Sequence, residues 1–115
     1  MTKYLISFPS EAMDVGDDEL PAVADAAHAV IREAMDAGVY VFGGGIDEDV
    51  APVRVAGDGS VTDDTYPATA GIRGGFTVVD VPSRDEALMW AAKIAVACRC
   101  PQEVRAFQFD PLADF

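Results

Sequence analysis

The sequence predicts an α+β fold of the ferredoxin-like kind, an antiparallel sheet with two helices on one face. The expected elements follow the order β-α-β, a hairpin-rich middle and β-α-β, and two such units in sequence are typical of this arrangement. Half of the 115 residues are apolar, which is enough for one core in a chain of this length. Glycines stand where expected elements end, as at Gly38. We therefore expect a single domain over residues 1–115.

The first unit begins with a β-favouring run, Lys3 to Phe8, which Pro9 closes. After a polar loop, Asp17 or Asp18 is expected to cap a helix that Gly38 ends. Apolar residues at three- and four-residue spacing give this helix one apolar stripe. They are Leu20, Val23, Ala24, Ala27, Val30, Ile31, Ala34 and Met35.

Residues 39–42 (VYVF) predict a second strand, in which Tyr40 and Phe42 share one face. The glycine run at 43–45 is typical of a strand end that bends or packs closely. A Gly-Asp-Gly sequence at 57–59 predicts a hairpin turn between residues 52–56 and 60–62. Residues 63–74 follow as a longer irregular segment.

The second unit begins with a strand at residues 76–81 (FTVVDV). Ser83 and Glu86 form a capping box that opens a helix running to about Cys98. Residues 103–109 (EVRAFQF) predict the last strand, ahead of a short acidic tail.

The strands do not separate into one polar and one apolar face. Phe107 and Phe109 alternate with Val104 and Ala106, so that both faces carry apolar side chains. A sheet with helices on one side must cover its second face or keep it polar. A second copy of the chain on a two-fold axis is the commonest solution, and we therefore expect a homodimer.

Charge and composition exclude several partners. The formal net charge is −12, which disfavours nucleic acids and anionic membranes. The apolar runs are too short to span a bilayer and the first residues lack a secretory signal, so a cytoplasmic protein is expected. Cys98 and Cys100 stand too close in sequence to bridge, and with one histidine they fall short of a zinc set. We expect reduced thiols, no metal and no cofactor.

Several segments together resemble a known family. They are KYLISF at 3–8, DAGVY at 36–40 followed by three glycines and Ile46, GSVTD at 59–63, GGFTVVDV at 74–81 and DEALMWAAK at 85–93. The family is that of YCII-related, or DGPF-type, domains, and the resemblance runs from Lys3 to about Phe107. It implies a ferredoxin-like protomer that pairs into a dimeric α+β barrel, in a family suspected of enzymatic activity.

The sequence departs from the family pattern at three places. The family's Thr-Asp-Gly-Pro-Phe segment is replaced by Thr-Asp-Asp-Thr-Tyr at 62–66, so Asp63 and an aromatic residue are retained. The Glu and Lys that follow it in the family are Ala68 and Ala70. The counterpart of the family's helical histidine is His28, which lies one residue closer to Gly38 than the pattern implies.

These residues suggest a candidate site with two interpretations. His28 and Asp63 could act as an acid–base pair, with Asp64, Tyr66 and Arg73 binding an anionic or carbonyl-bearing ligand. Alternatively, His28 is a boundary residue of its helix and Asp63 closes a turn through its backbone.

Three functions therefore remain open. One is a cofactor-independent enzyme acting on a small molecule. Another is a non-catalytic ligand-binding or regulatory dimer, in which apolar barrel residues such as Phe42, Phe76 and Phe107 matter and the polar pair does not. The third is a purely structural dimer or protein-partner module, which would have a solid interior and no pocket.

Overall fold

The structure is a computed structural model that describes residues 1–113. The strands are β1 (Thr2–Phe8), β2 (Tyr40–Gly45), β3 (Arg54–Val55), β4 (Val61–Thr62), β5 (Gly75–Val81) and β6 (Glu103–Ala106). The helices are α1 (Leu20–Asp36) and α2 (Arg84–Cys98), with short 3₁₀ turns η1 (Ser10–Ala12) and η2 (Pro67–Thr69).

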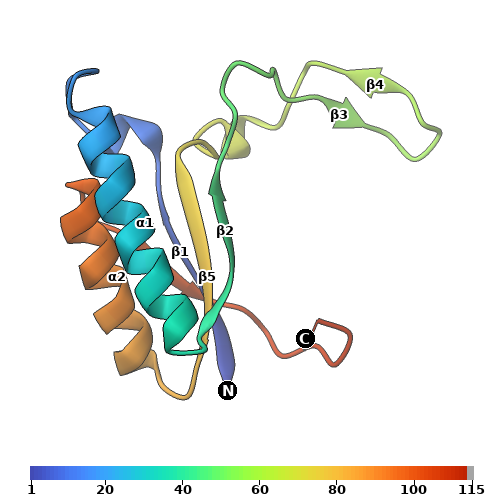
Figure 1. The fold of residues 1–115 in the computed structure, drawn as a ribbon. Coiled ribbons are helices and arrows are strands. Elements are labelled where there is room, and N and C mark those ends of the chain that lie inside the picture. Colours follow the sequence, from blue (N-terminus) through green and yellow to red (C-terminus); the bar gives the residue numbers. More distant parts are fainter. Residues whose placement is uncertain (114–115) are drawn as a thin grey trace.

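Four strands form one antiparallel sheet in the order β2-β5-β1-β6, and β3 pairs with β4 in a separate hairpin. Figure 1 shows α1 and α2 side by side on one face of the sheet. The other face, which we call the open face, carries no helix in the part of the chain that the structure describes. The predicted ferredoxin-like arrangement is confirmed.

The core lies between the sheet and the two helices. Ile6 of β1 and Val79 and Val81 of β5 are almost fully buried there, against Ala87 and Trp90 of α2. Pairing of Tyr4 with Val79 places alternate residues of both central strands on this face. The predicted apolar stripe of α1 is buried only in part, at Val23 and Ala34.

The start of α2 agrees with the sequence prediction, whereas the start of α1 does not. The Ser83 hydroxyl accepts a hydrogen bond from the Glu86 N–H at 3.2 Å, as the capping box predicts. The prediction that Asp17 or Asp18 caps α1 is wrong, because Glu19 occupies that position in a helical conformation and makes no side-chain cap.

A bulge in β2 changes the faces that its side chains occupy. Tyr40 pairs with Val79, whereas Phe42 pairs with Val78, with a register shift between them. Tyr40 therefore packs against the core while Phe42 is exposed on the open face. The prediction that Tyr40 and Phe42 share one face is wrong for this reason.

The last strand is shorter than the sequence predicts. β6 ends at Ala106, and residues 107–109 leave the sheet after a single hydrogen bond from Phe107 N–H to the Lys3 carbonyl at 2.9 Å. We call residues 107–113 the tail.

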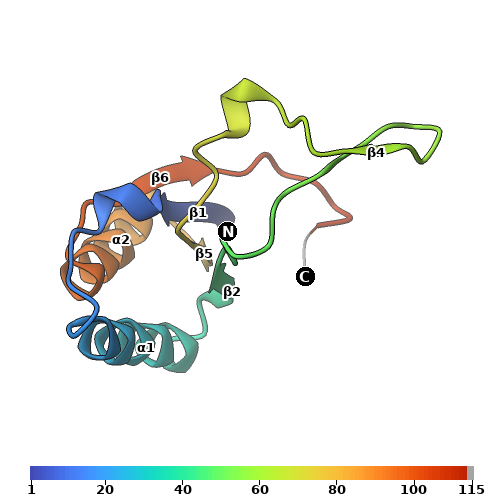
Figure 2. The same cartoon turned by 90° about the horizontal axis from the view of Figure 1, so that it is seen from above.

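Residues 46–74 form an arm that extends from the sheet and carries the β3–β4 hairpin. Figures 1 and 2 show the arm and the tail on the side of the sheet opposite the helices. The radius of gyration is 15.7 Å, against about 13 Å for a compact chain of this length. The arm is thus an extension of the protomer and adds little to its core.

Among the described residues, no helix is long and apolar enough to cross a membrane.

Candidate functional site

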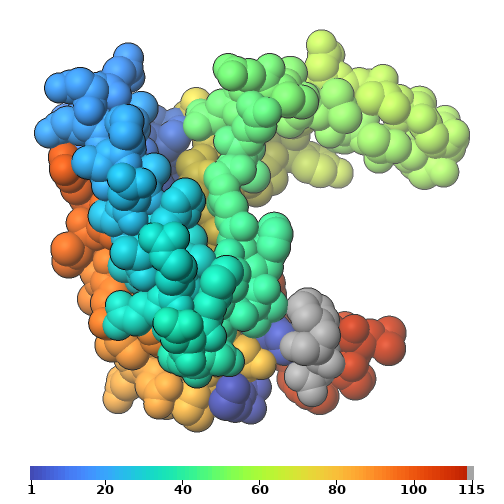
Figure 3. All heavy atoms as spheres, in the orientation of Figure 1, coloured from blue at the N-terminus to red at the C-terminus, as the bar shows by residue number. Residues whose placement is uncertain are grey.

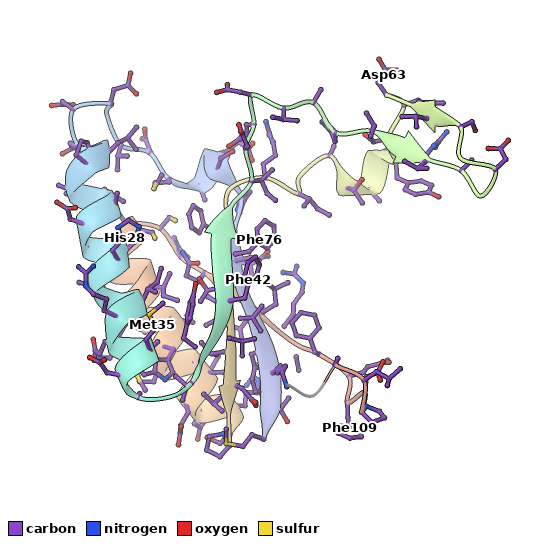
Figure 4. The ribbon with its side chains drawn as sticks, turned by 45° about the vertical axis from the view of Figure 1, so that its right-hand side comes forward. His28, Met35, Phe42, Asp63, Phe76 and Phe109 are labelled. Atoms are coloured by element: carbon purple, nitrogen blue, oxygen red, sulfur yellow. The ribbon has the colours of Figure 1, made fainter. Side chains whose placement is uncertain are left out.

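The predicted catalytic pair is separated within one chain. His28 is exposed on α1, and Asp63 follows β4 in the arm. Figure 4 shows the two side chains on opposite sides of the sheet. An acid–base step that uses both would need a second subunit, so their catalytic role stays a prediction.

A pocket of about 610 Å³ opens in the arm, and we call it the arm pocket. Its volume is in the range of small-molecule sites. Two of the predicted ligand-binding residues, Tyr66 and Arg73, line it. The remaining wall is mainly apolar and is formed by Ile46, Val50, Pro52, Val53, Val55, Ala70 and Ile72, with Asp47, Glu48, Arg54, Thr65 and Thr69 as polar members.

Arg54 connects the predicted residues to one another. Its guanidinium lies 5.4 Å from the centre of the Tyr66 ring and 3.7 Å from an Asp64 carboxylate oxygen. The stacking orients the guanidinium, whereas the ion pair is exposed and therefore weak. An anionic ligand in the pocket could displace Asp64 and take its place on Arg54.

Sequence reasoning missed Arg54. The signal was present, because the hairpin predicted around Gly57-Asp58-Gly59 places Arg54 opposite Thr62, next to the Asp63-Asp64 pair. A cation there is the expected neighbour of two adjacent carboxylates.

Arg73 lies where the arm joins the sheet. It forms an ion pair with Glu11 of η1. The Ser10 hydroxyl donates a hydrogen bond to a Glu48 carboxylate oxygen at 3.0 Å, in the segment that leads from β2 into the arm. Both contacts hold the arm pocket against the 3₁₀ turn after β1.

A second pocket, of about 540 Å³, lies on the open face beside the tail. Lys3, Val78 and Phe107 line it, and Lys3 forms an ion pair with Asp80 at 3.6 Å. The other Asp80 carboxylate oxygen is buried and accepts no hydrogen bond from a described residue. Figure 4 shows Phe42 and Phe76 on the sheet between the arm and the tail.

The cysteines are buried and free. Burial raises the pKa of both the Cys98 and the Cys100 thiols, and the neighbouring Cys100 adds to the effect on Cys98. Both groups are therefore poor nucleophiles near neutral pH. Within residues 1–113, no group of three or more His, Cys, Asp and Glu side chains is placed to hold a metal ion.

Comparison with known proteins identifies a family. The family model described as the YCII-related domain matches residues 4–106, which is most of the chain. No curated protein matches the chain significantly.

Proposed function

The chain belongs to the YCII-related domain family, and on this basis we propose that it is a homodimeric module that binds a small molecule in the arm pocket. The observation that carries the proposal is the convergence of Arg54, Tyr66 and Arg73 on one mainly apolar pocket of about 610 Å³. Apolar walls with a few oriented polar groups are the usual composition of a ligand site.

The walls indicate the class of ligand. The apolar part suits an aromatic or branched aliphatic body, and the guanidinium of Arg54 suits a carboxylate. The lining residues include no histidine and no cysteine, and the carboxylates of Asp47 and Glu48 accept hydrogen bonds from the Asp49 N–H and the Ser10 hydroxyl, so the proposal is one of binding. The acid–base use of His28 and Asp63 lies outside this proposal, since neither residue lines the pocket.

The dimer is supported by what the protomer leaves exposed. Phe42 and Phe107 lie uncovered on or beside the open face, and the arm carries further exposed apolar side chains. Apolar surface of this extent on one side is typical of an interface. The free thiols of Cys98 and Cys100 suit a reducing compartment such as the cytoplasm.

Phenylbutyrate, an aromatic carboxylate, is a suitable first probe, and phenylbutanol is its neutral counterpart. We expect phenylbutyrate to shift the amide NMR signals of residues 46–73. Arg54→Met should weaken phenylbutyrate binding about tenfold, as expected for loss of one charge-assisted hydrogen bond. It should leave phenylbutanol binding unchanged.

Arg84→Met is the matched control, because Arg84 is an exposed arginine at the start of α2. Shifts confined to other residues, or an Arg54→Met protein that binds phenylbutyrate like the parent, would overturn the arm pocket as the ligand site. Sedimentation equilibrium tests the dimer, and a single-chain mass at micromolar concentration would overturn that part.

A further inference from the structure

The arm and the tail stand at opposite ends of the open face. The arm joins the sheet where Gly45 pairs with Gly75, which itself pairs with Phe8 at the end of β1. The tail leaves at the beginning of β1, next to Lys3. Figure 3 shows both projecting to the same side with a hollow between them.

The arm is held away from its own sheet. Gly74 has φ of +91°, and a Cβ there would lie 2.2 Å from the Phe8 carbonyl oxygen. Ile46 N–H donates to the Gly74 carbonyl at 2.9 Å, so both ends of the arm are tied together. In this conformation no described residue of the open face lines the arm pocket, because all of its lining residues belong to the arm itself.

The arm pocket lacks a wall. Its lining residues all belong to residues 46–73, and most are exposed, with Val53 at 57%. The tail lines the second pocket, but it leaves its apolar side chains uncovered. Phe109 is 81% exposed and Leu112 is 94% exposed.

A two-fold axis can supply both the missing wall of the arm pocket and a cover for the tail. In an isologous dimer every contact occurs twice, so an arm that meets the partner's tail implies a tail that meets the partner's arm. Two open faces packed against each other lie about 10 Å apart. Two of the three overall extents are 43 Å, about twice the ~20 Å thickness of one sheet and one helix layer. Figures 1 and 2 show the arm projecting on the side away from the helices, so it is long enough to reach a partner packed on the open face.

Charge favours arm against tail over arm against arm. The arm carries two arginines and six acidic residues, which are Asp47, Glu48, Asp49, Asp58, Asp63 and Asp64. Two arms in contact would repel each other. At the tail end, Lys3 is paired with Asp80 and Arg105 with Glu103, and the described tail adds only Asp110. The negative charge that an arm would meet there is therefore smaller than the charge of a second arm.

We infer that the tail of one protomer forms the missing wall of the arm pocket of its partner, with Phe109 as the principal contact. The inference rests on the proposed function, because it assigns the second subunit a part in the same ligand site. The bound ligand then lies between the arm of one chain and the tail of the other.

Cysteine cross-linking tests this arrangement. Val53→Cys marks the arm pocket and Phe109→Cys marks the tail, and both positions are exposed. The two single variants are mixed after isotope labelling of one, exchanged through unfolding and refolding, and oxidised with copper phenanthroline. We expect a cross-linked dimer that contains one labelled and one unlabelled chain. The parent protein, whose two cysteines are buried, is the control.

Each other outcome overturns the inference. Cross-linking of Val53→Cys alone would show arm against arm, and cross-linking of Phe109→Cys alone would show tail against tail. A dimer without any cross-link, or a monomer, would equally exclude a tail at the pocket.

Phenylbutyrate binding separates this inference from the proposed function. Phe109→Ala should weaken binding about tenfold, and Phe109→Leu should restore most of the affinity. If the parent binds phenylbutyrate in the arm but the mixture does not cross-link, the ligand site stands and the shared wall fails. If the mixture cross-links but phenylbutyrate does not bind, the proposed ligand site fails.

Discussion

In the helical half of the protein, the apolar side chains of β1, β5 and α2 are buried against one another; in the arm, side chains of the same kind are exposed. Val79 of β5 is fully buried and Val55 of β3 is 62% exposed, although both valines lie in β-strands. The difference shows that burial in this chain depends on which elements face each other. A substitution should therefore affect folding in one half and association or binding in the other.

The largest effect on folding is expected at Trp90. It is only 5% exposed on α2, and removing a buried aromatic side chain costs about 3–5 kcal/mol. Trp90→Ala should lower the free energy of unfolding by that amount in a urea titration. Val96→Ala, on the exposed side of the same helix, should change it by less than about 0.5 kcal/mol. Similar effects for the two variants would show that α2 is covered on both sides.

The next effect concerns the root of the arm. Gly74→Ala puts a Cβ against the Phe8 carbonyl in a left-handed backbone conformation, which should cost at least about 2 kcal/mol. Gly71→Ala is the matched control, because open space surrounds that glycine and its φ is not positive. Urea titration of both variants checks the prediction. An undisturbed Gly74→Ala protein would mean that the arm is hinged at its root.

A smaller effect on the free energy of unfolding is expected where a side chain accepts a hydrogen bond from a backbone N–H, and this contact occurs in both halves. Ser83→Ala removes the hydroxyl that caps α2 and should cost about 1 kcal/mol. Asp58 accepts a similar hydrogen bond from the Ser60 N–H at 2.8 Å in the arm. Asp58→Asn should leave global unfolding unchanged, because the turn is not part of the core. A loss of stability in Asp58→Asn would show that the hairpin folds together with the sheet.

The same aspartate gives a pH test. Hydrogen bonds from Ser60 lower the pKa of Asp58 below its ordinary value of 3.8. A depressed pKa means that the turn is stabilised above the unfolded value and loses this contribution as the pH falls through the folded one. Carboxyl NMR titration should find Asp58 below 3.8, and Ser60→Ala should move it upward.

The smallest effect on stability is expected from ionisation of the Cys98 and Cys100 thiols at high pH. Burial raises the pKa of Cys98 and Cys100 above the ordinary value of 9.0. The unfolded chain then releases these protons at lower pH than the folded one, so stability falls as the pH rises past 9.0. Both thiols should react slowly with a disulfide reagent in the folded protein and rapidly in urea. Rapid reaction in the folded state would contradict the burial.

Much of the fold was predictable from local patterns. The runs at residues 3–8 and 76–81 form the two central strands of the sheet, and the Ser83 capping box begins α2. Both were predictable because strand propensity and a capping hydrogen bond depend on residues that are neighbours in the sequence. The β2 bulge was not predictable, since it depends on pairing with β5. Nor was the early end of β6, because Phe107 and Phe109 have strand propensity but no second neighbouring strand at that edge of the sheet.

The candidate site was predicted only in part. The loop composition drew attention to Asp64, Tyr66 and Arg73, and the arm brings Tyr66 and Arg73 to one pocket, with Asp64 linked to it through Arg54. The pairing of His28 with Asp63 required knowledge of which elements meet in space. Side chains far apart in sequence cannot be placed together from spacing alone.

The way the arm is attached has a consequence for how such proteins can diversify. Strands β2 and β5 are adjacent and antiparallel, so a short turn could join them, and residues 46–74 stand in its place as an insertion closed at its base by the Ile46–Gly74 hydrogen bond. Lengthening a loop whose ends are already held together costs little free energy. The insertion can therefore change in length and sequence while the scaffold stays the same, so the proposed ligand site can vary independently of folding.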